Sequence, residues 1–134
     1  MPDVRIYVVD DDDDDRLFII EAINAVFKKV EVIEVVDGED FITTIQLDKD
    51  SSFPKLILLD VNMPKVNGLE VAAFMQTHPE YQNIPIVMFS TSHNPDMVQY
   101  AMELGVKRYI SKPFNISDYL QIVKEINDTF LTTN

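Results

Sequence analysis

The stretch LILLD, residues 56–60, consists of four apolar residues followed directly by an acid. A continuous apolar run of this length is typical of a strand that is buried on both faces of a parallel sheet. Met63-Pro64 and Asn67-Gly68 follow as loop signals. Apolar residues from Leu69 to Met75 then recur at helical spacing. This part of the chain therefore predicts a buried strand that ends at Asp60 and leads through a loop into a helix.

The same alternation of strand and helix runs through the rest of the chain. Apolar runs rich in β-branched residues predict the other strands, which are residues 6–9, 30–36, 84–89 and 107–111. Apolar residues at helical spacing predict the other helices, which are residues 17–27, 39–47, 95–104 and 116–130. Five such repeats predict an α/β fold, in which a parallel sheet carries helices on both faces.

Composition limits the classes of function. The chain has 134 residues, of which 46% are hydrophobic and 25% charged, as is usual for one globular domain. Its net charge of −12 argues against nucleic acid as a partner, because phosphate backbones require clustered Lys and Arg. The absence of cysteine excludes disulfides, thiolate metal sites and cysteine nucleophiles. With no signal-peptide pattern and no membrane-spanning apolar stretch, we expect a cytoplasmic protein without membrane contact.

Polar residues follow four of the predicted strands at the point where each strand ends. Asp10 and Asp11 follow the first strand, Asp60 the third, Ser90 the fourth and Lys112 the fifth. The carboxyl ends of parallel strands meet at one edge of a sheet, so we expect these side chains to lie together. Two carboxylates ~4 Å apart repel by about 4 kcal/mol at an effective dielectric of about 20. Mg²⁺, which prefers oxygen ligands, is the ion that best relieves such crowding.

A site of this composition suits phosphoryl transfer. A carboxylate can take the phosphoryl group as a nucleophile. The metal ion and Lys112 would stabilise charge on the transferring oxygens, and the hydroxyl of Ser90 would hydrogen-bond the new group.

At these positions the chain resembles the CheY-like receiver domains of two-component response regulators. The resemblance runs from Val4 to about Phe130 and is carried by the motifs IYVVDDD, LILLDVNMPKVNGLE, PIVMFSTS and YISKPF. The second motif follows the family pattern D-x-x-M-P-x-x-x-G from Asp60 to Gly68. The resemblance implies the fold known for CheY, a flavodoxin-like, doubly wound sheet of five parallel strands in the order 2-1-3-4-5, flanked by five helices. It also implies a single receiver domain over residues 1–134 without an output domain.

The resemblance further implies which residues bind the metal ion and the phosphoryl group. Asp60 is expected to be the phosphoacceptor. Asp11 is expected to bind Mg²⁺ together with Asp60, with the backbone carbonyl of Asn62 and, through water, with Asp10. A shift of one residue in this correspondence would make Asp12 the ligand instead of Asp11.

Three more residues receive roles from the resemblance. Ser90 resembles the switch hydroxyl that turns toward the phosphoryl group, and Tyr109 resembles the aromatic residue that moves with it. Lys112 resembles the phosphate-binding lysine, and its peptide bond to Pro113 is expected to be cis.

The six consecutive aspartates, residues 10–15, also allow simpler interpretations. Asp12 to Asp15 are expected to form a solvated loop and a helix start, where the helix dipole favours acids. An EF-hand would use Asp10, Asp12, Asp14 and Glu21 as ligands, but its sixth position requires glycine and is an aspartate here. A strand also precedes this loop where an EF-hand has a helix, so an EF-hand is not predicted.

From the resemblance we expect a signalling switch and not an enzyme. A histidine kinase or phosphotransfer protein would phosphorylate Asp60, and a downstream protein would bind the changed face of the fourth helix, fifth strand and fifth helix. That face is expected to include Val98, Met102 and Val106. One alternative is a phosphatase of the haloacid dehalogenase type, which would need an acid where Asn62 stands. The other is a degenerate receiver that binds partners without phosphorylation.

Overall fold

The computed structural model describes residues 2–131, in which strands and helices alternate. Residue 1 and residues 132–134, the ends of the predicted single domain, lie outside the described residues. The strands are β1 Val4–Val9, β2 Val30–Val35, β3 Lys55–Asp60, β4 Ile86–Ser90 and β5 Arg108–Ser111. The helices are α1 Asp13–Val26, α2 Gly38–Leu47, α3 Gly68–Gln76, α4 Pro95–Glu103 and α5 Ile116–Ile126, followed by the π-helical turn η1 Asn127–Leu131. Across residues 2–131, every helix is too short or too polar to cross a membrane.

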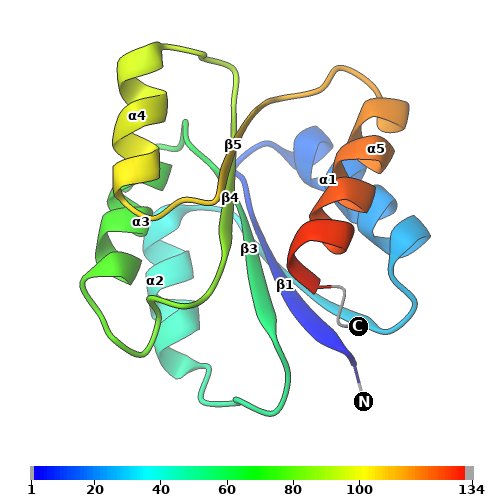
Figure 1. Ribbon diagram of the computed structural model, residues 1–134, viewed down its shortest axis with the longest axis horizontal. Helices are drawn as coiled ribbons and strands as arrows, with labels where there is room; N and C mark the ends of the chain where they lie inside the picture. Colours follow the sequence, from blue (N-terminus) through cyan, green and yellow to red (C-terminus); the bar gives the residue numbers. More distant parts are fainter. Residues whose placement is uncertain (1, 132–134) are drawn as a thin grey trace.

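The five strands form one parallel sheet in the order β2-β1-β3-β4-β5, as predicted. Figure 1 shows the sheet edge-on, with α1 and α5 on one face and α2, α3 and α4 on the other. The order reverses direction between β1 and β3, so the two connections leave the sheet on opposite faces. Such a point is where ligands bind in sheets of this class, beyond the carboxyl ends of the strands.

The apolar run that predicts β3 is buried on both faces of the sheet. Leu56 and Leu58 pack in the core beneath α1 and α5, whereas Ile57 and Leu59 pack in the core beneath α2, α3 and α4. Successive strand residues point to opposite faces, so a strand covered on both sides needs apolar residues at every position. This explains why β3 shows no polar alternation.

Asp or Asn side chains fix where the helices begin. Each of the five α-helices in the described chain has such a residue at its N-cap, where the side chain accepts a backbone N–H. Helix α1 begins at Asp13, one residue before the start expected at Asp14 and Asp15 and four before its apolar pattern, because Asp12 caps it. Strand β4 begins at Ile86 and not at the predicted residue 84, since Pro85 before it has no N–H to donate.

Gly68 allows the start of α3 to lie directly against the end of β3. A Cβ atom at this position would lie 2.5 Å from the carbonyl oxygen of Asp60 and 2.8 Å from the Cα of Val61. The N–H of Gly68 donates to the carbonyl oxygen of Val61 at 3.0 Å. A side chain here would therefore push the helix away from the strand end that carries Asp60.

A buried charged cluster closes the opposite end of the sheet. The side chain of Asp48 is only 6% exposed and accepts from Arg5 at 2.8 Å, from Lys55 at 3.2 Å and from the hydroxyl of Tyr7. Burial raises the pKa of Asp48, but the hydrogen bonds from Tyr7 and Arg5 outweigh it and lower the pKa to about 2. Asp48 thus joins the end of α2 to β1 and β3.

The lowered pKa of Asp48 predicts a pH-dependent contribution to stability. Because the folded pKa lies below the ordinary value of 3.8, the stabilisation is present above about pH 4 and is lost as the pH falls through about 2. We expect Asp48→Asn to lower the unfolding free energy by about 2 kcal/mol near neutral pH, with the difference narrowing below about pH 4. Urea unfolding across this pH range measures this difference, with Asp3→Asn, at an exposed residue outside the cluster, as control. If the difference in unfolding free energy between the wild type and Asp48→Asn does not change with pH, the lowered pKa of Asp48 is contradicted.

Candidate functional site

The candidate site lies at the carboxyl ends of β1, β3, β4 and β5, where four strands bring polar side chains together. Asp60 is the last residue of β3, Ser90 the last of β4, and Asp10 and Lys112 follow β1 and β5. Asp10 is 1% exposed and Asp60 2%, and Ser90 is fully buried. Among the described residues, these are the only polar or charged ones that are buried to this degree. Such burial of two carboxylates is unfavourable unless charges nearby compensate for it.

Backbone hydrogen bonds hold these side chains in place. The N–H of Asp10 donates to Val35 at 3.1 Å, which extends the β1–β2 ladder by one residue. The N–H of Lys112 donates to the carbonyl oxygen of Ser90 at 2.9 Å. The Asp60 carboxylate accepts from the N–H of Asn62 at 3.2 Å. Asp10, Asp60 and Lys112 are therefore positioned by hydrogen bonds at the ends of the strands.

Three carboxylates at this edge can hold a metal ion. Oxygens of Asp10, Asp11 and Asp60 lie within 4.8 Å of one another, and the exposed Asp11 opens the cluster to solvent. Oδ2 of Asp10 is buried and accepts no hydrogen bond in the structure; its cationic neighbour is the Nζ atom of Lys112, at 3.3 Å. A buried oxygen in this condition fits a hard divalent cation, which carboxylates bind readily. The donor set therefore suits Mg²⁺ or a similar ion.

The crowding perturbs the protonation of the site. Burial, followed by the nearby charge of Asp10, raises the pKa of Asp60 to about 7. Burial also raises the pKa of Asp10. Burial lowers the pKa of Lys112, but its hydrogen bond to Asp15 and the charges of Asp10 and Asp60 outweigh this and raise it above the ordinary value. Lys112 is thus a permanent cation, while Asp60 gains a proton readily when no other cation is near.

Lys112 forms ion pairs with three carboxylates. Its Nζ atom lies 3.3 Å from Oδ2 of Asp10, 3.3 Å from Oδ1 of Asp60 and 2.8 Å from Oδ2 of Asp15. The partner at the shortest distance is therefore Asp15, to which the sequence analysis gave no role at the site.

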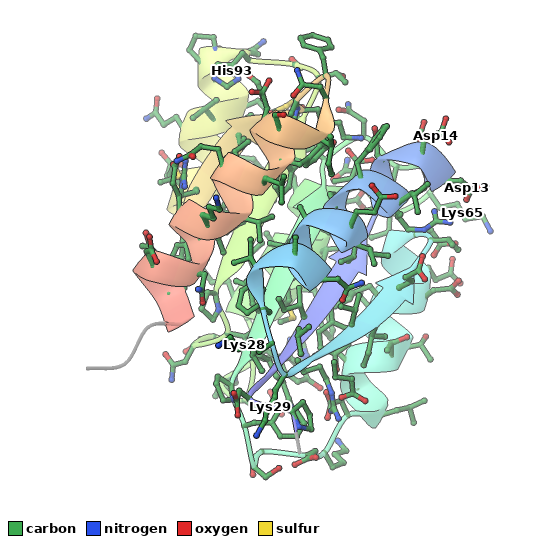
Figure 2. The ribbon with its side chains drawn as sticks, turned by 90° about the vertical axis from the view of Figure 1, so that its right-hand side faces the viewer. Asp13, Asp14, Lys28, Lys29, Lys65 and His93 are labelled. Atoms are coloured by element: carbon green, nitrogen blue, oxygen red, sulfur yellow. The ribbon has the colours of Figure 1, made fainter. Side chains whose placement is uncertain are left out.

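The prediction of solvated side chains is confirmed for Asp12, Asp13 and Asp14, which are exposed, and is wrong for Asp15, which is half-buried. Asp12 caps α1, with its side chain accepting from the N–H groups of Asp14 and Asp15. Asp15 binds Lys112, as described above. Figure 2 shows Asp13 and Asp14 at the start of α1 with their side chains directed away from the molecule, as predicted. No local sequence pattern pairs Asp15 with Lys112, because the two residues lie 97 positions apart.

Arg16 is a second residue that the sequence analysis missed. Its guanidinium donates to the backbone carbonyl of Asp10 at 2.8 Å and also binds the carboxylates of Asp13 and Glu34. It therefore ties the loop that carries Asp10 and Asp11 to α1 and β2. The carbonyl and the two carboxylates together hold the guanidinium in place.

The two residues assigned to the switch are hydrogen-bonded away from Asp60. The hydroxyl of Ser90 donates to Oδ1 of Asn62 at 3.2 Å and accepts from the N–H of Ser92 at 3.0 Å. The hydroxyl of Tyr109 donates to the carbonyl oxygen of Ser92 at 3.0 Å. Ser92 thus links the two side chains through its backbone.

Two sequence-based expectations near the site are wrong. Val106 was placed on the surface of the fourth helix and fifth strand, but it is 3% exposed and packs in the core beneath α4. Val98 is half-buried and Met102 is exposed. The bond between Lys112 and Pro113 was expected to be cis, but the described chain contains no cis peptide bond. Trans is the form that such bonds favour by ~0.5–1 kcal/mol.

Comparisons with known proteins agree with this geometry. The sequence model of the response regulator receiver domain matches residues 6–124. Response regulator Rcp1 from Synechocystis sp. is 34% identical over 135 residues, covering 98% of this chain and 92% of that protein. Chemotaxis protein CheY1 from Helicobacter pylori is 29% identical, covering 98% of this chain and 99% of its own.

Two solved structures of response regulators also resemble this chain. The crystal structure of the phosphorylated cyanobacterial phytochrome response regulator RcpA matches with a TM-score of 0.86 and 37% identity, covering 97% of this chain and 95% of that chain. The Mn²⁺-bound form of Rcp1 matches with a TM-score of 0.83 and 34% identity, covering 99% of this chain and 97% of that chain. Divalent-metal binding at the acidic cluster is therefore supported both by the donor set and by the family.

A divalent ion should stabilise the folded protein, because an ion that binds only the folded state raises its stability by mass action. We expect millimolar Mg²⁺ to raise the melting temperature by about 2–6 °C. Asp11→Asn should lose most of this rise, since it removes one carboxylate of the cluster. Asp14→Asn, which removes the same charge outside the cluster, should keep it. Calorimetry measures the melting temperature of the wild type and of each variant with and without Mg²⁺. If Mg²⁺ does not raise the melting temperature of the wild type, or if both variants lose the rise equally, the metal site is contradicted.

Proposed function

The chain belongs to the response regulator receiver family, whose members signal through phosphorylation, and we propose that Asp60 is the residue that accepts the phosphoryl group. The observation that carries this proposal is the position of its carboxylate. It is buried at the end of the central strand, 3.3 Å from the Nζ atom of Lys112 and within the cluster formed with Asp10 and Asp11. A nucleophile between a fixed cation and a metal site is suited to attack on phosphorus.

The proposed donor is a phosphohistidine of a histidine kinase or phosphotransfer protein. A carboxylate oxygen of Asp60 forms a bond to phosphorus while the bond between phosphorus and the imidazole nitrogen breaks. The electron pair of that bond stays on the imidazole, which takes up a proton. The products are an aspartyl phosphate and a neutral histidine. Lys112 lies where it can hold the phosphoryl oxygens during this transfer.

Mg²⁺ is the proposed resident ion, held by Asp10, Asp11, Asp60 and the backbone carbonyl of Asn62. When bound, it would supply positive charge that offsets both the carboxylate repulsion and the charge of the phosphoryl oxygens. The chain's own part is to keep Asp60 ionised. Lys112 lowers the pKa of Asp60, whereas burial and Asp10 raise it to about 7. The carboxylate thus depends on nearby cations for its reactive form.

Signalling is proposed to follow from a change in hydrogen bonding at Ser90 and Tyr109. An aspartyl phosphate adds acceptor oxygens that compete with Asn62 for the hydroxyl of Ser90. Turning of Ser90 would break its bond with the N–H of Ser92, whose carbonyl also holds Tyr109. Tyr109 is then free to change position, which shifts the population toward a second arrangement of α4 and β5.

The proposed downstream partner is a protein that binds the face formed by α4, β5 and α5. Met102 of α4 is 47% exposed, and the half-buried Val98 lies four residues before it on the same side of the helix, which suits contact with another protein. Nucleic acid and membrane surfaces are not proposed as partners, because the net charge of −12 repels both phosphate backbones and anionic lipids. We place this signalling in the cytoplasm, with output through protein contact.

A switch is favoured over a phosphatase by the residue two positions after Asp60. A phosphatase with an aspartate nucleophile needs a general acid there, and Asn62 cannot donate or accept a proton in that way. Its side-chain oxygen instead accepts from Ser90. The protein is therefore proposed to turn over its own aspartyl phosphate and no separate substrate.

The proposed function predicts one phosphoryl group on Asp60. Incubation with acetyl phosphate and Mg²⁺, followed by intact-protein mass spectrometry, should detect a single phosphoryl adduct. The adduct should be absent without the divalent ion and absent in Asp60→Asn. A phosphohistidine donor protein provides the second test. No adduct with either donor would favour the degenerate receiver, and an adduct that persists in Asp60→Asn would place the phosphoryl group elsewhere.

A further inference from the structure

We propose that Asp15 holds Lys112 in the unphosphorylated protein and must release it before Lys112 can bind the phosphoryl group. Asp15 would then be a positioning residue that opposes phosphoryl capture. The inference rests on the proposed function, since it concerns how the same site binds the phosphoryl group on Asp60.

The position of Lys112 carries this inference. Its ammonium group lies 2.8 Å from Asp15, which is a direct hydrogen bond, but 3.3 Å from both Asp10 and Asp60. The backbone of Lys112 is held at Ser90, so only the side chain can move between partners. Lys112 is therefore drawn toward α1 in this structure, while Asp60 remains within its reach.

A metal ion would strengthen the preference for Asp15. The cluster that can hold an ion joins Asp10, Asp11 and Asp60, and Asp15 does not belong to it. A divalent ion at the cluster offsets the charges of Asp10 and Asp60, which weakens their attraction for Lys112. The ion does not bind Asp15, so the carboxylate of Asp15 keeps its full attraction for Lys112. The phosphoryl group must then compete with Asp15 for the same ammonium group.

Asp15 can give up this ion pair without being left buried and unpaired. Its side chain is 26% exposed, so water can solvate the carboxylate. It also lies in the first turn of α1, where the partial positive charge of the helix N-terminus favours an acid. Its backbone stays fixed, because its N–H donates to Asp12 at 3.0 Å. Release thus requires a rotation of Lys112 and not a rearrangement of the helix.

The run of aspartates provides a matched control. Asp14 neighbours Asp15 and carries the same charge, but its side chain points into solvent (Figure 2). Asp14→Asn therefore changes the net charge of the chain by the same amount as Asp15→Asn and leaves Lys112 paired. A comparison of the two separates the ion pair from the general effect of charge on anion binding.

The test is a titration with beryllium fluoride, a stable mimic of the phosphoryl group, at saturating Mg²⁺, followed by NMR of backbone amides. We expect Asp15→Asn to bind the mimic about two- to fivefold more tightly than the wild type, the range of a partly exposed ion pair. Asp14→Asn should bind like the wild type. In a Lys112→Gln background, Asp15→Asn should no longer change the affinity, because it acts through Lys112. Asp15→Ser serves as a second variant.

Several outcomes would overturn the inference. Unchanged or weaker binding in both Asp15 variants would mean that Asp15 does not oppose capture. An equal gain in Asp14→Asn would assign the effect to net charge. A gain that persists without Lys112 would assign it to direct repulsion between Asp15 and the anion. If the wild type binds the mimic but the variants bind no tighter, only this inference fails. If the wild type does not bind it at all, the proposed function fails as well.

Discussion

The repulsion between two buried carboxylates, Asp10 and Asp60, is the constraint on which this edge of the sheet depends. Burial leaves neither group enough water to stabilise its charge, and burial together with Asp10 raises the pKa of Asp60 to about 7. Lys112 supplies one compensating cation, and the open side of the cluster at Asp11 leaves room for a second. Any group that adds or removes charge here therefore changes the electrostatic interactions among all the charged residues of the site.

The fold places these two carboxylates at the carboxyl ends of the strands, where a cation can bind them. Because helices cover both faces of the parallel sheet, β3 is apolar from Leu56 to Leu59, and its polar residues lie at its ends. At the opposite end, Asp48 is buried beside Arg5 and Lys55, and its pKa falls to about 2. The charge of Asp48 is thus balanced by cations of the chain itself. At the other end, Asp10 and Asp60 carry negative charge that an external cation can balance.

The fold and the gathering of polar residues at one edge were predictable, because the apolar run 56–59 and the acids after it are local patterns. The ion pair between Asp15 and Lys112 was not, since it joins residues 97 positions apart and depends on side-chain direction. The hydrogen bond from Arg16 to the carbonyl of Asp10 leaves no sequence pattern either. The burial of Val106 was missed because a single valine in the loop between α4 and β5 shows no periodicity that would reveal whether it is buried.

The most direct test is the titration of Asp60 itself, followed by NMR of its ¹³C-labelled carboxyl group with and without Mg²⁺. If crowding by Asp10 and burial govern the site, Asp60 should titrate near pH 7 in the metal-free protein. With Mg²⁺ bound, its pKa should fall well below that value, because the ion offsets the repulsion. A metal-free pKa close to the ordinary value of 3.8, unchanged by Mg²⁺, would contradict the view that carboxylate repulsion organises this site.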